Sequence, residues 1–131
     1  MIFFYLILAI LLLAMGIFFS RWSGWKNDVK AQIDVYKKLK KQLPEANENN
    51  LASRLLRLKI KNDKNESLKT HYETLSYQTG LTLRNALFFI IEYEYIRDRG
   101  LNPAESGPML FLYKVKDYIE EIVSNEFPGG A

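Results

Sequence analysis

The first twenty residues, MIFFYLILAILLLAMGIFFS, constrain this 131-residue chain more than any other stretch because they hold no charged side chain. As a helix rising about 1.5 Å per residue, the segment is about 30 Å long, which is the thickness of the hydrocarbon core of a bilayer. A helix that is apolar on every face has to be buried on every face. We therefore predict a transmembrane anchor over residues 1–20.

Two other interpretations of this segment stay open. Ala14 and Gly16 form an A-x-A-like pair, which is typical of the cleavage site of a secretory signal peptide. No basic side chain precedes the apolar run, and the run continues past that pair to Phe19, which favours a retained helix. The remaining alternative is an apolar helix buried inside a soluble fold.

Charged and aromatic residues follow the apolar run at once. Arg21, Trp22, Trp25 and Lys26 are of the types that anchor a helix at a membrane interface, where tryptophan rings and long basic side chains reach the headgroups. Seven Lys and Arg residues lie between positions 21 and 41, and none precedes the run. Since positively charged flanks stay in the cytoplasm, we predict a single-pass membrane protein with a short outer N-terminus and a cytoplasmic C-terminal domain.

Charge divides the chain into two unlike halves. Residues 21–70 hold thirteen basic and six acidic side chains, a net of +7, whereas residues 71–131 hold five basic and nine acidic, a net of −4. The basic half is consistent with a solvated helix face that sets topology. It also predicts attraction to anionic lipid, and the two interpretations are compatible.

Small residues recur every four positions across the end of the apolar run. Gly16, Ser20 and Gly24 lie on one face of a helix, and such a row lets two helices approach closely. The pattern predicts a homodimer. The alternative is that these small residues only ease the exit of the helix from a membrane.

The remainder of the chain has helical periodicity. One stripe comprises Val29, Ile33, Tyr36, Leu39 and Leu43, and the next comprises Leu51, Leu55 and Leu58. Later stripes predict a short helix before Gly80, a central helix between a Thr82 cap and Gly100, and a last helix beginning near Pro108.

These stripes predict an all-α fold in which one N-terminal transmembrane helix precedes a small cytoplasmic bundle of about four helices. The predicted divisions are the anchor at 1–20, a basic juxtamembrane amphipathic helix at 21–44, the bundle at 45–127 and a flexible tail at 128–131. About 110 residues are enough for one small core.

Residues that carry chemistry are scarce. The chain has one histidine and no cysteine, and it lacks glycine-rich phosphate loops, GxSxG and HExxH, so we predict no catalytic residue, no metal site and no cofactor. His71 lies near Glu73 but near no nucleophile. Glu92 and Glu94 follow an apolar run, and Glu94 shares a face with Asp98. These carboxylates are either partly desolvated or ordinary solvent-facing charges.

The stretch YETLSYQTGLTLRNALFFI resembles the helix–turn–helix of DNA-binding proteins, with Ser76 four positions before the turn residue Gly80. The resemblance implies that Thr82, Arg84 and Asn85 at the start of the second helix contact nucleic acid. Only Arg84 is basic there, and this half of the chain is acidic, which disfavours phosphate binding. Nucleic acid is therefore the alternative partner.

The favoured function is protein–protein interaction, as a non-catalytic subunit or adaptor of a membrane complex of the secretion, envelope or phage-related kind. Tyr93, Tyr95, Tyr113 and Tyr118 lie in the two most apolar helices, and aromatic residues are enriched in binding hot spots. The alternative role of these tyrosines is core filling.

Overall fold

The computed structural model describes residues 2–100 and 111–131, without the side chains of residues 15–23, 99, 111 and 112. All regular secondary structure in this part of the chain is helical. The helices are α1 (Ile2–Gln42), α2 (Glu48–Ile60), α3 (Glu66–Ser76), α4 (Leu83–Arg99) and α5 (Phe111–Glu126). The predicted all-α helical bundle is confirmed.

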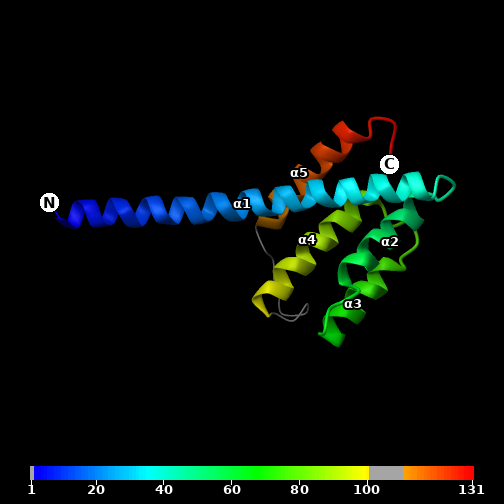
Figure 1. Cartoon of the computed structure of the whole chain (residues 1–131), viewed down its shortest axis with the longest axis horizontal. Coiled ribbons are helices and arrows are strands. Elements are labelled where there is room, and N and C mark those ends of the chain that lie inside the picture. The colour runs from blue at the N-terminus through cyan, green and yellow to red at the C-terminus, as the bar shows by residue number, and fades with distance from the viewer. Residues whose placement is uncertain (1, 101–110) are drawn as a thin grey trace.

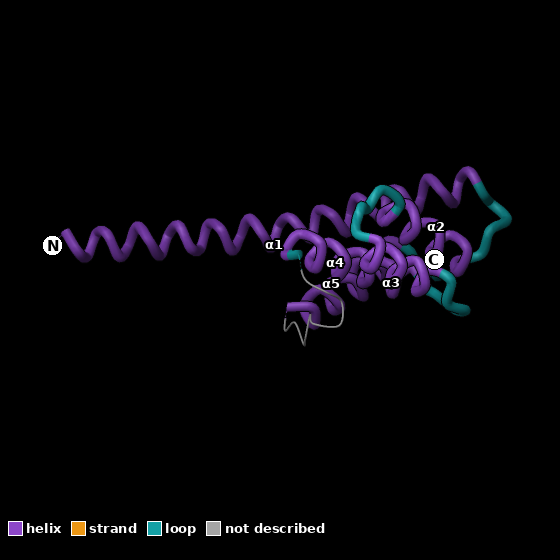
Figure 2. The backbone as a smooth tube through the Cα atoms, turned by 90° about the horizontal axis from the view of Figure 1, so that it is seen from below, coloured by secondary structure: helices purple, strands orange, loops and turns teal. Residues whose placement is uncertain are grey.

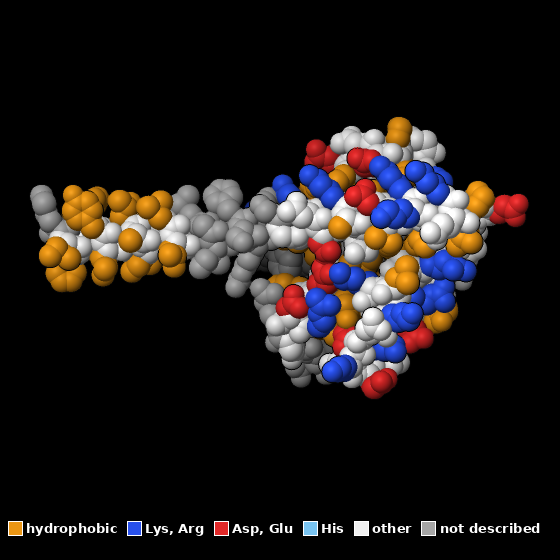
Figure 3. Space-filling view, in the orientation of Figure 1, with side chains coloured by type: hydrophobic (Ala, Val, Ile, Leu, Met, Phe, Trp, Pro, Cys, Tyr) orange, Lys and Arg blue, Asp and Glu red, His pale blue; other side chains and the backbone are white. Residues whose placement is uncertain are grey.

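α1 is one unbroken helix of 41 residues that has two different environments. Its C-terminal half packs against the other helices, and its N-terminal half projects away from them (Figures 1 and 2). In the projecting part, the large apolar side chains from Ile2 to Leu13 are exposed by 45% to 81%. In Figure 3 these apolar side chains lie along both edges of the projecting helix, whereas basic and acidic side chains are frequent on the visible face of the bundle.

The predicted transmembrane anchor at 1–20 is contradicted. Within the described residues, no helix combines the length and the apolar character that crossing a membrane requires. The predicted single-pass membrane localisation depended on that anchor, so it is contradicted as well.

Local signals in the sequence set the ends of the helices. α1 ends two residues before Pro44, which cannot continue a helix. Asn47, Asn65 and Thr82 cap α2, α3 and α4, each accepting a hydrogen bond from the backbone N–H three residues later. Gly100 ends α4 in the left-handed conformation, with φ of 62°, which confirms the predicted stop.

The main core lies where α1, α2, α4 and α5 meet. Its buried members are Val29, Ile33, Tyr36, Leu51, Leu55, Leu56, Leu83, Leu87, Ile90, Ile91, Val115, Ile119 and Val123. The predicted stripe of α1 therefore points inward. The predicted stripe of α2 is wrong at its third member, because Leu58 is 52% exposed and faces solvent.

α2 also holds the turn between α3 and α4. The side-chain amide of Asn49 donates a hydrogen bond of 3.1 Å to the carbonyl oxygen of Gln78. Oε1 of Glu48 accepts one of 3.2 Å from the backbone N–H of Leu83 at the start of α4. The corner at Gly80, where φ is +78°, is thus fixed by contacts from a third helix.

Candidate functional site

One face of α2 carries a row of basic side chains that points away from the core. Arg54, Arg57 and Lys61 follow one another at intervals of three and four residues, so they share one side of the helix. The other side of α2 bears Leu55 and Leu56, which are fully buried. Core packing therefore fixes the rotation of α2 and with it the outward direction of the three cations.

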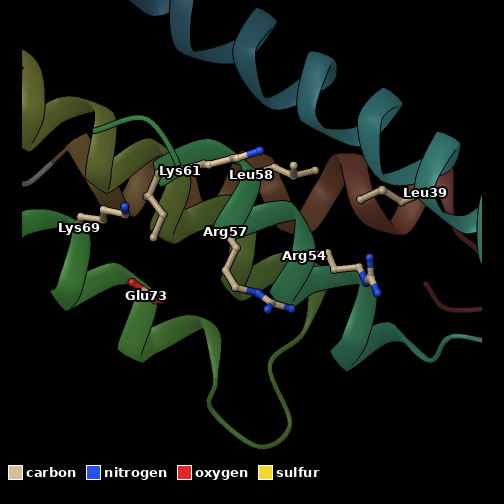
Figure 4. A pocket seen from close by; sticks show the side chains of 8 residues that line it. Leu39, Arg54, Arg57, Leu58, Lys61, Lys69 and Glu73 are labelled. Atoms are coloured by element: carbon tan, nitrogen blue, oxygen red, sulfur yellow. The ribbon is translucent and has the colours of Figure 1, made fainter. Parts of the chain in front are cut away.

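A groove of about 520 Å³ runs beside this row, between α2 and the facing parts of α1 and α3 (Figure 4). Its lining comprises Leu39, Arg54, Arg57, Leu58, Ile60, Lys61, Lys69 and Glu73. Leu39 comes from α1, and Lys69 and Glu73 come from α3. Three consecutive helices thus build one surface.

A second hollow of about 510 Å³ extends the first toward the α1–α2 turn. It is lined by Gln42, Leu43, Pro44, Glu45, Ala46, Asn50, Arg54 and Arg57. Because both hollows share Arg54 and Arg57, they form one elongated surface, which we call the α2 groove. From Asn50 to Lys61 it follows about 16 Å of helix axis.

The α2 groove has an excess of positive charge. Arg54, Arg57, Lys61 and Lys69 line it together with two carboxylates, those of Glu73 in the first hollow and Glu45 in the second, which leaves a net of +2. None of the four cations belongs to an ion pair among the described residues. An anionic ligand would therefore meet cations that the fold has not neutralised.

Arg57 is the cation whose position the structure fixes most firmly. Its guanidinium carbon lies 5.1 Å from the centre of the Tyr77 ring, and its Nε donates a 3.4 Å hydrogen bond to the carbonyl oxygen of Ser53. Both contacts restrict the side chain before any ligand arrives. Less conformational entropy is then lost on binding.

Leu58 supplies the exposed apolar part of the groove. At 52% exposure it is the one large hydrophobic residue of α2 that is open to solvent. It lies between Arg57 and Lys61 in the sequence and lines the same wall. The groove thus offers an apolar contact framed by cations, a combination that suits an amphipathic ligand.

A separate charged cluster joins three helices on another side of α2. The Lys59 ammonium forms an ion pair with Glu94 of α4 and lies 3.8 Å from Oδ1 of Asp28 on α1. Burial, and then the neighbouring Asp28 carboxyl, raise the pKa of Glu94 to about 7, against the opposing influence of Lys59. With its side chain 18% exposed, Glu94 is partly desolvated, and Asp98 pairs with Arg97 instead.

Three of the four predicted tyrosine contacts, Tyr93, Tyr95 and Tyr118, are parts of the packed interior. Tyr93 is 1% exposed and donates a hydrogen bond to Asp63, so it fills the core and offers no surface to a partner. Tyr118 is half-buried, with its ring edge-to-face against Trp25 at 5.4 Å and the Lys26 ammonium 5.0 Å from its centre. Tyr95 is half-buried as well, whereas Tyr113 is 67% exposed.

The residues predicted for a membrane interface and for self-association lie partly in the bundle and partly where no side chains are described. Trp25 and Lys26 contact Tyr118 of α5, so they belong to the bundle. Of Gly16, Ser20, Arg21 and Trp22 the structure describes only the backbone, as part of α1. Gly24 is exposed, with open space around the position of a Cβ atom.

The residues that carry the helix–turn–helix resemblance make contacts within the protein. The hydroxyl oxygen of Thr82 caps α4 by accepting a hydrogen bond from the backbone N–H of Asn85. Arg84 forms an ion pair of 2.9 Å with Glu120 and donates a 3.3 Å hydrogen bond to Ser124, both on α5. Ser76 is buried and His71 is exposed. Of the three predicted nucleic-acid contacts, Asn85 is exposed, and Thr82 and Arg84 are half-buried.

Sequence reasoning missed the α2 groove. The spacing of Arg54, Arg57 and Lys61 indicates a basic helix face, but Leu58 also fits the core stripe by its spacing, so its exposure beside these cations was not predicted.

Comparison with protein-family models, with curated proteins and with solved structures gave no match. The chemistry of the groove therefore has to be inferred from its own residues. No group of three or more metal-ligating side chains occurs in the described part of the chain.

Proposed function

We propose that this protein is a non-catalytic interaction module, a subunit or adaptor that joins partner proteins in a larger assembly. The observation that carries the proposal is the α2 groove, where four cations without an ion pair among the described residues flank the exposed Leu58. A surface of unneutralised charge around an apolar centre suits a docking site with a polar rim.

The projecting part of α1 supports the same function. Eleven large apolar side chains between Ile2 and Leu13 are exposed to solvent in the isolated chain. A patch of this kind marks an interaction surface, and an all-round apolar helix is covered by several neighbours instead of one. We propose that helices of the assembly enclose residues 2–14.

The two surfaces are separated in a way that suits an adaptor. Figure 1 shows the N-terminal end of α1 at one extremity of the molecule, while α2 and α3, which build the groove, lie toward the other. Partners held at these two places would not compete for space. The single helix α1 runs from one surface to the edge of the other, where Leu39 lines the groove.

Photocrosslinking in cells tests the proposal. A photoreactive residue is placed at Leu8, at Leu58 or at the exposed control position Glu121 of α5, always in the full-length chain. We expect protein adducts at Leu8 and at Leu58 that differ from each other and are absent from the control. Adducts with lipid alone at Leu8, together with nucleic acid or nothing at Leu58, would contradict the adaptor function.

A further inference from the structure

The shape of the α2 groove narrows the class of ligand. The surface follows α2 over about 16 Å and is open along its length. From Arg54 to Lys61, three cations extend over about 10 Å of helix axis. A compact anion such as a single phosphate would contact only part of this row, whereas an elongated ligand with repeated negative charges would contact all of it.

The apolar side chains of the α2 groove restrict the class of ligand further. Leu58 is exposed at the centre of the basic row, and the half-buried Leu39 faces it from α1 (Figure 4). A ligand that matches these contacts carries an aliphatic side chain among its carboxylates. The sugar–phosphate backbone of a nucleic acid has no such group, and the Tyr77 ring, which could stack on a base, already contacts Arg57.

We infer that the α2 groove binds an acidic amphipathic helix of a protein partner. Carboxylates at positions i, i+3 or i+4, and i+7 of that helix would face Arg54, Arg57 and Lys61, because both helices have the same rise per residue. A leucine-type side chain between them would rest on Leu58, and Lys69 of α3 would pair with a carboxylate on the far side of the groove. This inference rests on the proposed function and specifies the partner of the same site.

The test is a fluorescence-anisotropy titration of the full-length protein in mild detergent. The probe is a labelled helical peptide of about four turns with Glu at the matching positions and Leu between them. Comparators are a scrambled peptide of the same composition, a polyglutamate of equal charge and a short DNA duplex. We expect the patterned peptide to bind at least about tenfold more tightly than the scrambled peptide and the polyglutamate.

Matched variants locate the binding. Arg54→Glu with Lys61→Glu should weaken binding of the patterned peptide at least about tenfold, whereas Lys30→Glu with Lys116→Glu, the same change in charge at exposed positions outside the groove, should weaken it less than about twofold. Leu58→Asn should weaken it several-fold without changing charge. The exposed positions of all five residues favour an intact fold, which circular dichroism checks.

Each contrary result has a definite meaning. Equal binding of the patterned and scrambled peptides, or equal losses in the two double variants, would reduce the site to a generic basic surface and overturn the inference. Tighter binding of the duplex, abolished by Arg54→Glu with Lys61→Glu, would assign the groove to nucleic acid. If cellular crosslinking recovers protein partners whose capture does not change in the groove variants, the adaptor function stands and the inference about its ligand is wrong.

Discussion

The hydroxyl of Tyr72 on α3 donates a hydrogen bond of 2.6 Å to Oε1 of Glu92 on α4, twenty positions later in the chain. Tyr72 is fully buried, and burial, the hydrogen bond and the charge of Glu92 all raise the pKa of its hydroxyl. The ring also lies edge-to-face against Tyr93 at 5.4 Å. This contact joins α3 to α4 inside a second, smaller hydrophobic cluster, which comprises Ile60, Leu68, Tyr72, Tyr93 and Ile96.

Removing the Tyr72 hydroxyl should therefore destabilise the fold. We expect Tyr72→Phe to lower the free energy of unfolding by about 1–3 kcal/mol, because the Glu92 carboxylate loses a charge-assisted hydrogen bond while the ring stays packed. Urea denaturation followed by circular dichroism measures the change. Tyr113→Phe is the matched control, since Tyr113 is 67% exposed, and it should change stability by less than about 0.5 kcal/mol. Equal effects of the two substitutions would contradict the structural role of the bond.

Glu94 should make stability depend on pH. Its pKa is raised from 4.5 to about 7 in the folded state, first by burial and then by Asp28, against Lys59. The folded protein thus binds the Glu94 proton more tightly than the unfolded chain does, and the stabilisation is complete below pH 4.5 and is lost as pH rises through about 7.

The difference between the wild type and Glu94→Gln isolates this contribution. Carboxylates that do not contact Glu94 are common to both proteins, so their contributions cancel in the difference. We expect the stability of the wild type relative to Glu94→Gln to fall between pH 4.5 and 7, as measured by urea midpoints. Glu121→Gln, at an exposed position on α5, should give a curve parallel to that of the wild type. A flat difference for Glu94→Gln would contradict the raised pKa.

Elements governed by neighbouring residues could be predicted from the sequence. Thr82 and Gly100 were identified as the two ends of the central helix because capping depends on the local backbone. Val29, Ile33 and Tyr36 were identified as a buried stripe because their spacing matches one helical face. Leu51 and Leu55 of α2 were predicted to be buried for the same reason, and they are.

Features that need three helices could not be predicted in the same way. Glu94 meets Asp28, 66 positions away, and no periodicity within either helix shows that contact. The α2 groove needs Leu39 from α1 and Lys69 from α3, so its composition is tertiary. Leu58 fitted the expected stripe by spacing alone, yet the neighbouring Leu55 and Leu56 were enough to fill that side of α2.

The rotation of α2 can be tested by comparing Leu55 with Leu58. Leu55 is fully buried in the main core and Leu58 is 52% exposed in the groove. We expect Leu55→Ala to lower the free energy of unfolding by about 2–5 kcal/mol, because it removes buried methyl groups and leaves a cavity. Leu58→Ala should cost less than about 0.5 kcal/mol in the same denaturation experiment. A reversed order would place Leu58 in the core and remove the apolar centre of the groove.

The last prediction concerns the projecting part of α1. Among the side chains that the structure describes in α1, those of residues 2–14 are exposed to solvent and Val29 is the first that is buried, so residues 2–14 add little to the stability of the bundle. A chain that begins at Met15 should keep its helical circular dichroism and change the free energy of unfolding by less than about 0.5 kcal/mol. It should also associate less in sedimentation than the full chain, in which the apolar side chains of residues 2–14 are exposed. Ile7→Lys with Leu11→Lys, two changes on one face of the projecting helix, should reduce that association in the full-length protein without loss of bundle stability. A shortened chain that fails to fold, or a doubly charged chain that associates as before, would show that this segment has a different role from the one proposed.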